Sequence, residues 1–173
     1  MSCSRRARSM IAGSGAHSGA TEITVDHLAR PAIATSANGK AAATSTVATG
    51  SGTFAFRVGP TGTVQTVAVD ATTTLQGLAT AINALDAGAT ASVVNVGTTT
   101  SPDYRLRLGS DETGTAQAVS IVTDDTTLGV AVTQTALNAE FTVGGFEDPL
   151  TRDGNTGSDV IPGVSLTLVA AGG

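Results

Sequence analysis

Short stretches in which apolar and polar residues alternate make up most of the chain. Ile23 and Val25 alternate with polar neighbours, and the same period of two runs through Tyr104, Leu106 and Leu108. This period places successive side chains on opposite faces of an extended strand. Further strands are predicted at 53–58, 63–69, 89–96, 118–122, 139–143 and 160–169. Turn-forming glycines separate several of them, so neighbouring strands are expected to pair as hairpins.

One segment has the period of a helix instead. Its apolar residues fall on one helical face, at Leu75, Leu78, Ala79, Ile82 and Leu85. Residues 70–74 offer N-cap side chains and Gly88 supplies a C-cap. The sequence therefore predicts one amphipathic helix, about Leu75–Leu85, in a β-dominated α+β fold of small antiparallel sheets and hairpins. The segment 128–137 fits either a short strand or part of a helix, and both interpretations stay open.

Other segments lack either period. Residues 1–20, rich in Ser, Gly and Arg, are expected to form a disordered leader. Residues 35–52 and 147–159 are small or polar and are predicted to be loops. Within 160–169, Pro162 and Gly163 predict a turn.

The order of these segments also suggests how the chain divides into domains. Residues 21–51 and 138–173 are expected to pair into a first, discontinuous module. Residues 52–137, which contain the predicted helix, would then form a second module inserted into the first. Such an arrangement would bring the two ends of the chain together.

Composition excludes several classes of partner. The formal net charge is −5 and the only lysine is Lys40, so no nucleic acid is expected to bind. No run approaches the roughly 18 apolar residues of a membrane span, so no membrane is expected either. Aromatic residues make up 3% of the chain, too few for the usual lining of a cofactor pocket. The single cysteine, Cys3, has no second thiol for a disulfide or a metal site.

No arrangement of reactive side chains predicts an enzyme. His27 stands beside Asp26 without a nucleophile elbow elsewhere, so it is interpreted as a surface or turn histidine. The adjacent carboxylates at 111–112 and 124–125 would point to opposite faces of a strand and are interpreted as solvated turns. Residues 153–159 alternate oxygen-bearing side chains but lack the glycine and glutamate of an EF-hand. No catalytic, cofactor-binding or metal-binding residue is predicted.

Two arginines, Arg105 and Arg107, lie on the polar face of the predicted strand 104–108. They could bind an acidic partner. Charged side chains on an exposed strand more often prevent edge-to-edge aggregation, and we favour that interpretation.

The segment 74–83 (TLQGLATAIN), followed by 88–94 (GATASVV), resembles the IN motif of flagellins and hook-associated proteins. The segments 23–29, 104–114 and 139–168 resemble, in the same order, the head region of the flagellar filament cap family, hook-associated protein 2. The resemblance covers about residues 21–169. The family's N-terminal and C-terminal helices, which form its leg, have no counterpart in this sequence.

The resemblance implies a structural, extracellular component of the bacterial flagellum. Its partners would be further copies of itself in a cap ring, which requires the missing leg helices, and flagellin, whose assembly the cap assists. Contact of the head with surfaces or host mucin is also implied. The alternative is a surface-exposed domain of another hook-associated protein, a flagellin variable region or an adhesin, since the IN motif is shared among these.

Overall fold

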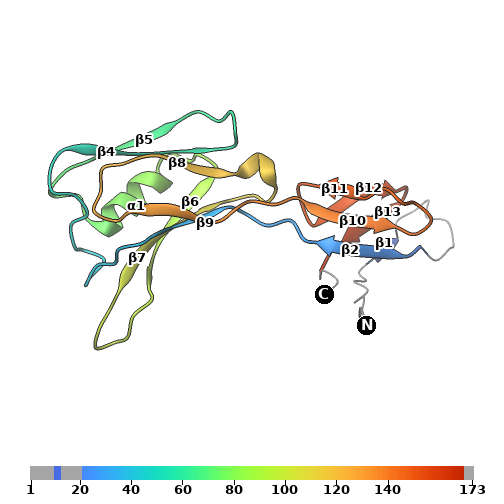
Figure 1. The fold of residues 1–173 in the computed structure, drawn as a ribbon, viewed down its shortest axis with the longest axis horizontal. Helices are drawn as coiled ribbons and strands as arrows, with labels where there is room; N and C mark the ends of the chain where they lie inside the picture. Colours follow the sequence, from blue (N-terminus) through green and yellow to red (C-terminus); the bar gives the residue numbers. More distant parts are fainter. Residues whose placement is uncertain (1–9, 13–20, 170–173) are drawn as a thin grey trace. The chain divides into compact units, whose positions relative to one another are not determined.

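The computed structural model describes residues 10–12 and 21–169 and divides into two compact units (Figure 1). The larger unit comprises Pro31–Glu112 and Ala116–Ala136. The smaller unit comprises Met1–Arg30, Thr113–Thr115 and Leu137–Gly173, so it is built from both ends of the chain. Both units consist mainly of short antiparallel strands, which confirms the predicted β-dominated α+β class.

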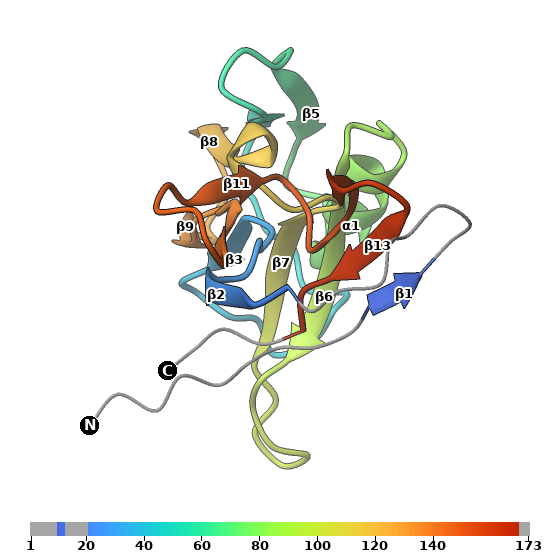
Figure 2. The same ribbon diagram turned by 90° about the vertical axis from the view of Figure 1, so that its right-hand side faces the viewer.

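The larger unit contains two antiparallel sheets. One has the strand order β6 (Ala89–Asn95), β7 (Tyr104–Ser110), β3 (Ile33–Ser36) and β9 (Val130–Gln134). The other has the order β5 (Gln65–Val69), β4 (Gly52–Val58) and β8 (Val119–Asp124), and the short 3-10 helix η1 (Thr115–Gln117) precedes β8. The α-helix α1 (Leu75–Asn83) lies between these two sheets, as Figures 1 and 2 show.

Helix α1 forms where the sequence predicts it. Thr74 has an extended backbone, and its Oγ1 accepts a hydrogen bond from Gly77 N at 3.0 Å, which caps the first turn. The buried face consists of Leu75, Leu78, Ala79 and Ile82. The helix ends at Asn83 rather than at Leu85, because the backbone turns away through positive φ angles at Asp86 (48°) and Gly88 (72°).

Both sheets and the helix of the larger unit share one hydrophobic core. Phe54 and Phe56 of β4 are fully buried, with their ring centroids 6.3 Å apart. Leu106 and Leu108 of β7 are also fully buried, as the alternation along that strand predicts. The apolar face of α1 packs among these side chains, so the helix holds the two sheets together through apolar contacts.

The smaller unit contains two three-stranded sheets. Their orders are β1 (Met10–Ala12), β13 (Val164–Thr167), β12 (Thr156–Ile161), and β11 (Leu150–Arg152), β10 (Ala139–Val143), β2 (Ile23–His27). The core of this unit includes Val25, Phe141 and Leu166. The predicted turn at Pro162–Gly163 joins β12 to β13, and Gly163 has a φ of 74°, a conformation that favours glycine.

Several loop predictions were wrong. The predicted loop 35–52 begins inside β3, whose small residues Ala34 and Ser36 are buried because β3 is paired on both sides. The predicted loop 147–159 contains β11 and the start of β12. Within the predicted leader, Met10–Ala12 forms β1 against β13, and the rest of 1–20 lies outside the described residues. The undecided segment 128–137 contains strand β9.

The division of the chain also differs in one segment from the expectation. Residues 31–51, expected in the first module, lie in the larger unit. The reason is that β3 is hydrogen-bonded between β7 and β9, both of which belong to that unit. No helix in the described part of the chain is long and apolar enough to cross a membrane.

The packing of α1 predicts the effect of a truncation. Leu78→Ala, at a fully buried position, should lower the free energy of unfolding by about 2–5 kcal/mol through lost burial and a cavity. Gln76→Ala, on the exposed face of the same helix, is the matched control and should change it little. Denaturant unfolding of both variants measures the difference, and equal midpoints for the two would contradict the helix's place in the core.

Candidate interaction surface

The hairpin β6–β7 projects beyond the rest of the larger unit in both views (Figures 1 and 2). Its strands pair in register from Ala89 opposite Ser110 to Asn95 opposite Tyr104. Residues 96–103 connect the two strands and are here called the tip loop. The loop is mostly exposed, so its shape depends on hydrogen bonds rather than on burial.

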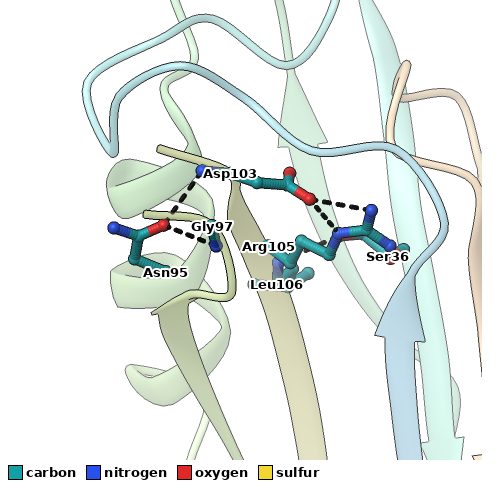
Figure 3. Close-up of polar contacts among 6 residues, drawn as sticks. All are labelled: Ser36, Asn95, Gly97, Asp103, Arg105 and Leu106. Atoms are coloured by element: carbon teal, nitrogen blue, oxygen red, sulfur yellow. Dashed lines mark hydrogen bonds and ion pairs between the residues drawn. The ribbon is translucent and has the colours of Figure 1, made fainter. Parts of the chain in front are cut away.

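Hydrogen bonds define the shape of the tip loop (Figure 3). The side chain of Asn95 accepts at its Oδ1 from Gly97 N at 3.0 Å and from Asp103 N at 2.9 Å. Val96 N donates to Asp103 O at 2.9 Å, which extends the hairpin by one backbone bond. One asparagine side chain thus ties both ends of the loop together. Sequence reasoning did not assign this role to Asn95.

An ion pair fixes the base of the tip loop. Asp103 Oδ2 lies 2.8 Å from Arg105 Nη2 and accepts a hydrogen bond from Arg105 Nε at 2.9 Å (Figure 3). Arg105 also donates to the backbone oxygen of Ser36 at 3.4 Å, which connects β7 to β3. The interpretation of Arg105 and Arg107 as edge protection was wrong, because β7 has a neighbour on each side and presents no edge.

The hairpin also exposes apolar groups. Val94 and Val96 have 41% and 59% of their surface exposed. Next to them the tip loop carries a run of hydroxyl side chains, Thr98 to Ser101. We call Val94 and residues 96–103 the hairpin surface. It offers methyl and hydroxyl groups, and its one carboxylate, Asp103, is already paired, so it suits weak, uncharged contacts.

The side chain of Asn83 covers the outer edge of β6. Its Oδ1 accepts a hydrogen bond from Ala91 N at 2.7 Å, and its Nδ2 donates to Ala91 O at 2.9 Å. An edge strand otherwise presents such N–H and C=O groups to any approaching strand. The carboxamide therefore takes the place of a neighbouring strand at Ala91 and joins the end of α1 to the sheet.

The smaller unit contains a similar two-point bond, to a residue that lies just after strand β2. Asn155 Oδ1 accepts from Ala29 N at 2.8 Å, and Asn155 Nδ2 donates to Ala29 O at 2.9 Å. Nearby, Arg152 Nη2 lies 2.7 Å from Asp159 Oδ2. The hydrogen bond from Arg152 is the main reason that the pKa of Asp159 lies below its ordinary value of 3.8.

The carboxylates at 111, 124 and 125, singled out in the sequence, accept hydrogen bonds that connect segments of the larger unit. Asp124 Oδ2 accepts from Val130 N at 2.7 Å, and Asp125 Oδ2 accepts from Thr53 N at 2.8 Å. Asp111 accepts from the hydroxyl of Thr90. His27 is half-buried on β2, opposite Glu140. Among the described residues, no three His, Cys, Asp or Glu side chains lie close enough together to hold a metal ion.

Known structures share this architecture. No family model matches the sequence, and no curated protein matches it significantly. The crystal structure of the flagellar cap protein FliD D2-D3 domains from Escherichia coli matches with a TM-score of 0.77 and 26% identity, over 94% of this chain and 88% of that one. FliD from Pseudomonas aeruginosa PAO1 matches with a TM-score of 0.68 and 25% identity, over 94% and 78%.

The fold of the chain therefore matches that of the head domains of flagellar cap proteins. A longer FliD structure from Escherichia coli, with its D1-D2-D3 domains, gives a TM-score of 0.76 and 27% identity, and the chain spans 49% of its length. The match indicates a structural, non-enzymatic component of the flagellum, located outside the cell. The resemblance of the sequence to the head region of the filament cap is thereby confirmed.

The two-point bond of Asn83 predicts a stability effect in the cap head. Asn83→Ala should lower the free energy of unfolding by about 1–3 kcal/mol, because it leaves Ala91 N and O without their partner. Ser92→Ala changes the next residue of β6 and serves as control. Equal unfolding midpoints for the two variants would show that the carboxamide adds nothing to stability.

The lowered pKa of Asp159 predicts a pH dependence in the smaller unit of the cap head. Since folding lowers this pKa, the Asp159–Arg152 pair stabilises the fold above pH 3.8, and the contribution is lost as the pH falls through the lower, folded value. Arg152→Gln should therefore be less stable than wild type at neutral pH and equally stable in acid. A stability difference that persists unchanged in acid would contradict this assignment.

Proposed function

We propose that this cap head region works with further copies of itself at the tip of the filament and assists the assembly of flagellin there. The observation that carries the proposal is the match to cap-protein head domains over 94% of the chain. In this proposal the assembling contacts also need helical segments flanking the head. The structures reported above are all of cap proteins, which favours this role over the alternatives named from the sequence, a flagellin variable region, an adhesin or another hook-associated protein.

The proposed mechanism is steric and conformational. Each unit is a folded body with its own core, and the projecting tip loop is fixed by Asn95 and Asp103. A cap must present a defined surface to subunits arriving in the unfolded state without pairing with their strands. The Asn83 carboxamide supports this role, because it occupies the backbone groups of Ala91 on the edge strand β6.

We further propose that the hairpin surface contacts surfaces outside the cell. Val94, Val96 and the hydroxyl groups of the tip loop favour an uncharged, hydroxyl-rich partner, such as the glycans of host mucin. The formal net charge of −5 disfavours strongly acidic partners over most of the chain. The two units would act as two head modules, the larger inserted into the smaller.

Complementation tests the assembly role. The head, expressed with its native flanking sequence in a cap-deficient strain, should restore filament growth and motility. The hairpin variant Val94→Ser with Val96→Ser should still restore growth but reduce adhesion to mucin-coated surfaces. Val64→Ser, at another exposed valine (45% exposed), is the control and should behave as wild type.

Two outcomes would contradict these roles separately. A folded, exported wild-type protein that fails to restore filaments would contradict the assembly role. Unchanged adhesion of the hairpin variant would contradict only the surface contact.

A further inference from the structure

Asn38 is followed by a glycine, unlike every other asparagine of the chain. The chain has five asparagines, Asn38, Asn83, Asn95, Asn138 and Asn155. The backbone nitrogen that follows an asparagine can attack the side-chain carboxamide, and a side chain on the following residue hinders this attack. Glycine has no side chain and allows the widest range of backbone angles, so it hinders the attack least.

The hydrogen bonds of Asn38 also differ from those of the asparagines that hold the fold. Asn83 and Asn155 each use both carboxamide atoms on a backbone partner. Asn38 is exposed, and its carboxamide makes one bond, from Nδ2 to Thr127 O at 3.0 Å. In the described part of the chain, Gly39 N donates no hydrogen bond. The attacking nitrogen and the carbonyl of the carboxamide are therefore both uncommitted.

A side chain at position 39 would disturb the base of the tip loop. A Cβ atom added to Gly39 would coincide with Asp103 Oδ1. To make room for it, the carboxylate of Asp103 would have to move, and its other oxygen pairs with Arg105 at the base of the tip loop. Any larger residue at 39 would disturb that ion pair. The contact with Asp103 thus disfavours a side chain at position 39 and favours the dipeptide that makes Asn38 reactive.

We infer that Asn38 is a site of spontaneous deamidation in the folded protein. Gly39 N attacks Cγ of Asn38, the bond from Cγ to Nδ2 breaks, and ammonia leaves with the proton from Gly39 N, which gives a succinimide. Water then opens either carbonyl of the ring and gives aspartate or isoaspartate at position 38. Water is the only co-reactant, and no oxidation or reduction occurs.

The modification changes both the charge and the backbone at position 38, where the chain contacts Leu128 and, through Lys40, Tyr104. It adds one negative charge and removes the donor to Thr127 O. Isoaspartate also inserts one methylene into the main chain, between two backbone contacts. Asn38 N donates to Leu128 O at 2.9 Å, and Lys40 N donates to Tyr104 O at 2.9 Å, so both cannot keep their present lengths without adjustment. We expect the isoaspartate form to be less stable than the unmodified protein.

Incubation in water labelled with heavy oxygen tests the inference. The folded protein is held at mildly alkaline pH, digested in ordinary water, and analysed peptide by peptide by mass spectrometry. The Asn38 peptide should incorporate the label, and the peptides with Asn83 and Asn155 should not. Isoelectric focusing should show one additional acidic band in wild type and none in Asn38→Gln, where ring closure is slower because the ring is larger.

Two results would overturn the inference. The first is a folded protein in which Asn38 takes up no more label than Asn83 and Asn155, while the urea-unfolded chain labels Asn38 readily. That result would show that the fold protects this site. The second is labelling of the Asn38→Gln variant equal to wild type, which would place the reaction elsewhere.

A second measurement separates the charge from the backbone effect. Asn38→Asp carries the added charge with a normal backbone, so it should unfold at a midpoint between those of wild type and the purified isoaspartate form. An isoaspartate form as stable as Asn38→Asp would contradict the expected strain at the Leu128 and Tyr104 contacts.

Discussion

Two asparagine side chains each satisfy both backbone groups of one residue, and each unit of the cap head contains one of them. Asn83 binds both backbone groups of Ala91, and Asn155 binds both backbone groups of Ala29. Backbone N–H and C=O groups that leave water must be paired, and the edge of a small sheet has few strands available for this. One carboxamide has the donor and the acceptor needed to satisfy both groups at once.

The bond of Asn83 explains the geometry around α1. The helix can pack its apolar face between two sheets only if its end stays close to β6. Because Asn83 is the last residue of α1, its bonds to Ala91 fix that end directly. The core then closes around Leu78 and Ile82, which are fully buried. The hydrogen bonds of Asn83 at the end of α1 thus help to hold the apolar face of the helix in the core.

Local periodicity predicted the helix and most strands, because each of these has enough apolar residues to show its own period. It failed for β3 and for β11, whose residues are mostly small or polar. The burial of Ala34 and Ser36 comes from strands distant in sequence, and no local pattern encodes it. The interpretation of Arg105 failed for the same reason, since the order of strands in a sheet is a long-range property.

The candidate surface was predictable only in part. The sequence located the strands 89–96 and 104–108 and the turn-rich segment between them. The roles of Asn83, Asn95 and Asn155 could not be predicted, because a carboxamide shows its partner only when the chain has folded. Asn83 lies in the segment that resembles the IN motif and Asn155 in one that resembles the cap family, so the resemblances marked both positions without explaining them. The role of each carboxamide becomes clear only from the backbone groups that the folded chain brings next to it.

The discontinuity of the smaller unit has a consequence for the order in which the chain can fold. The larger unit has all its residues once Ala136 is available. The smaller unit must wait for β10 to β13, so Ile23 and Val25 of β2 have no partner for most of the time that the chain is emerging. Contacts between residues this far apart in sequence form slowly. A chain that emerges N-terminus first would therefore fold its larger unit first and its smaller unit last.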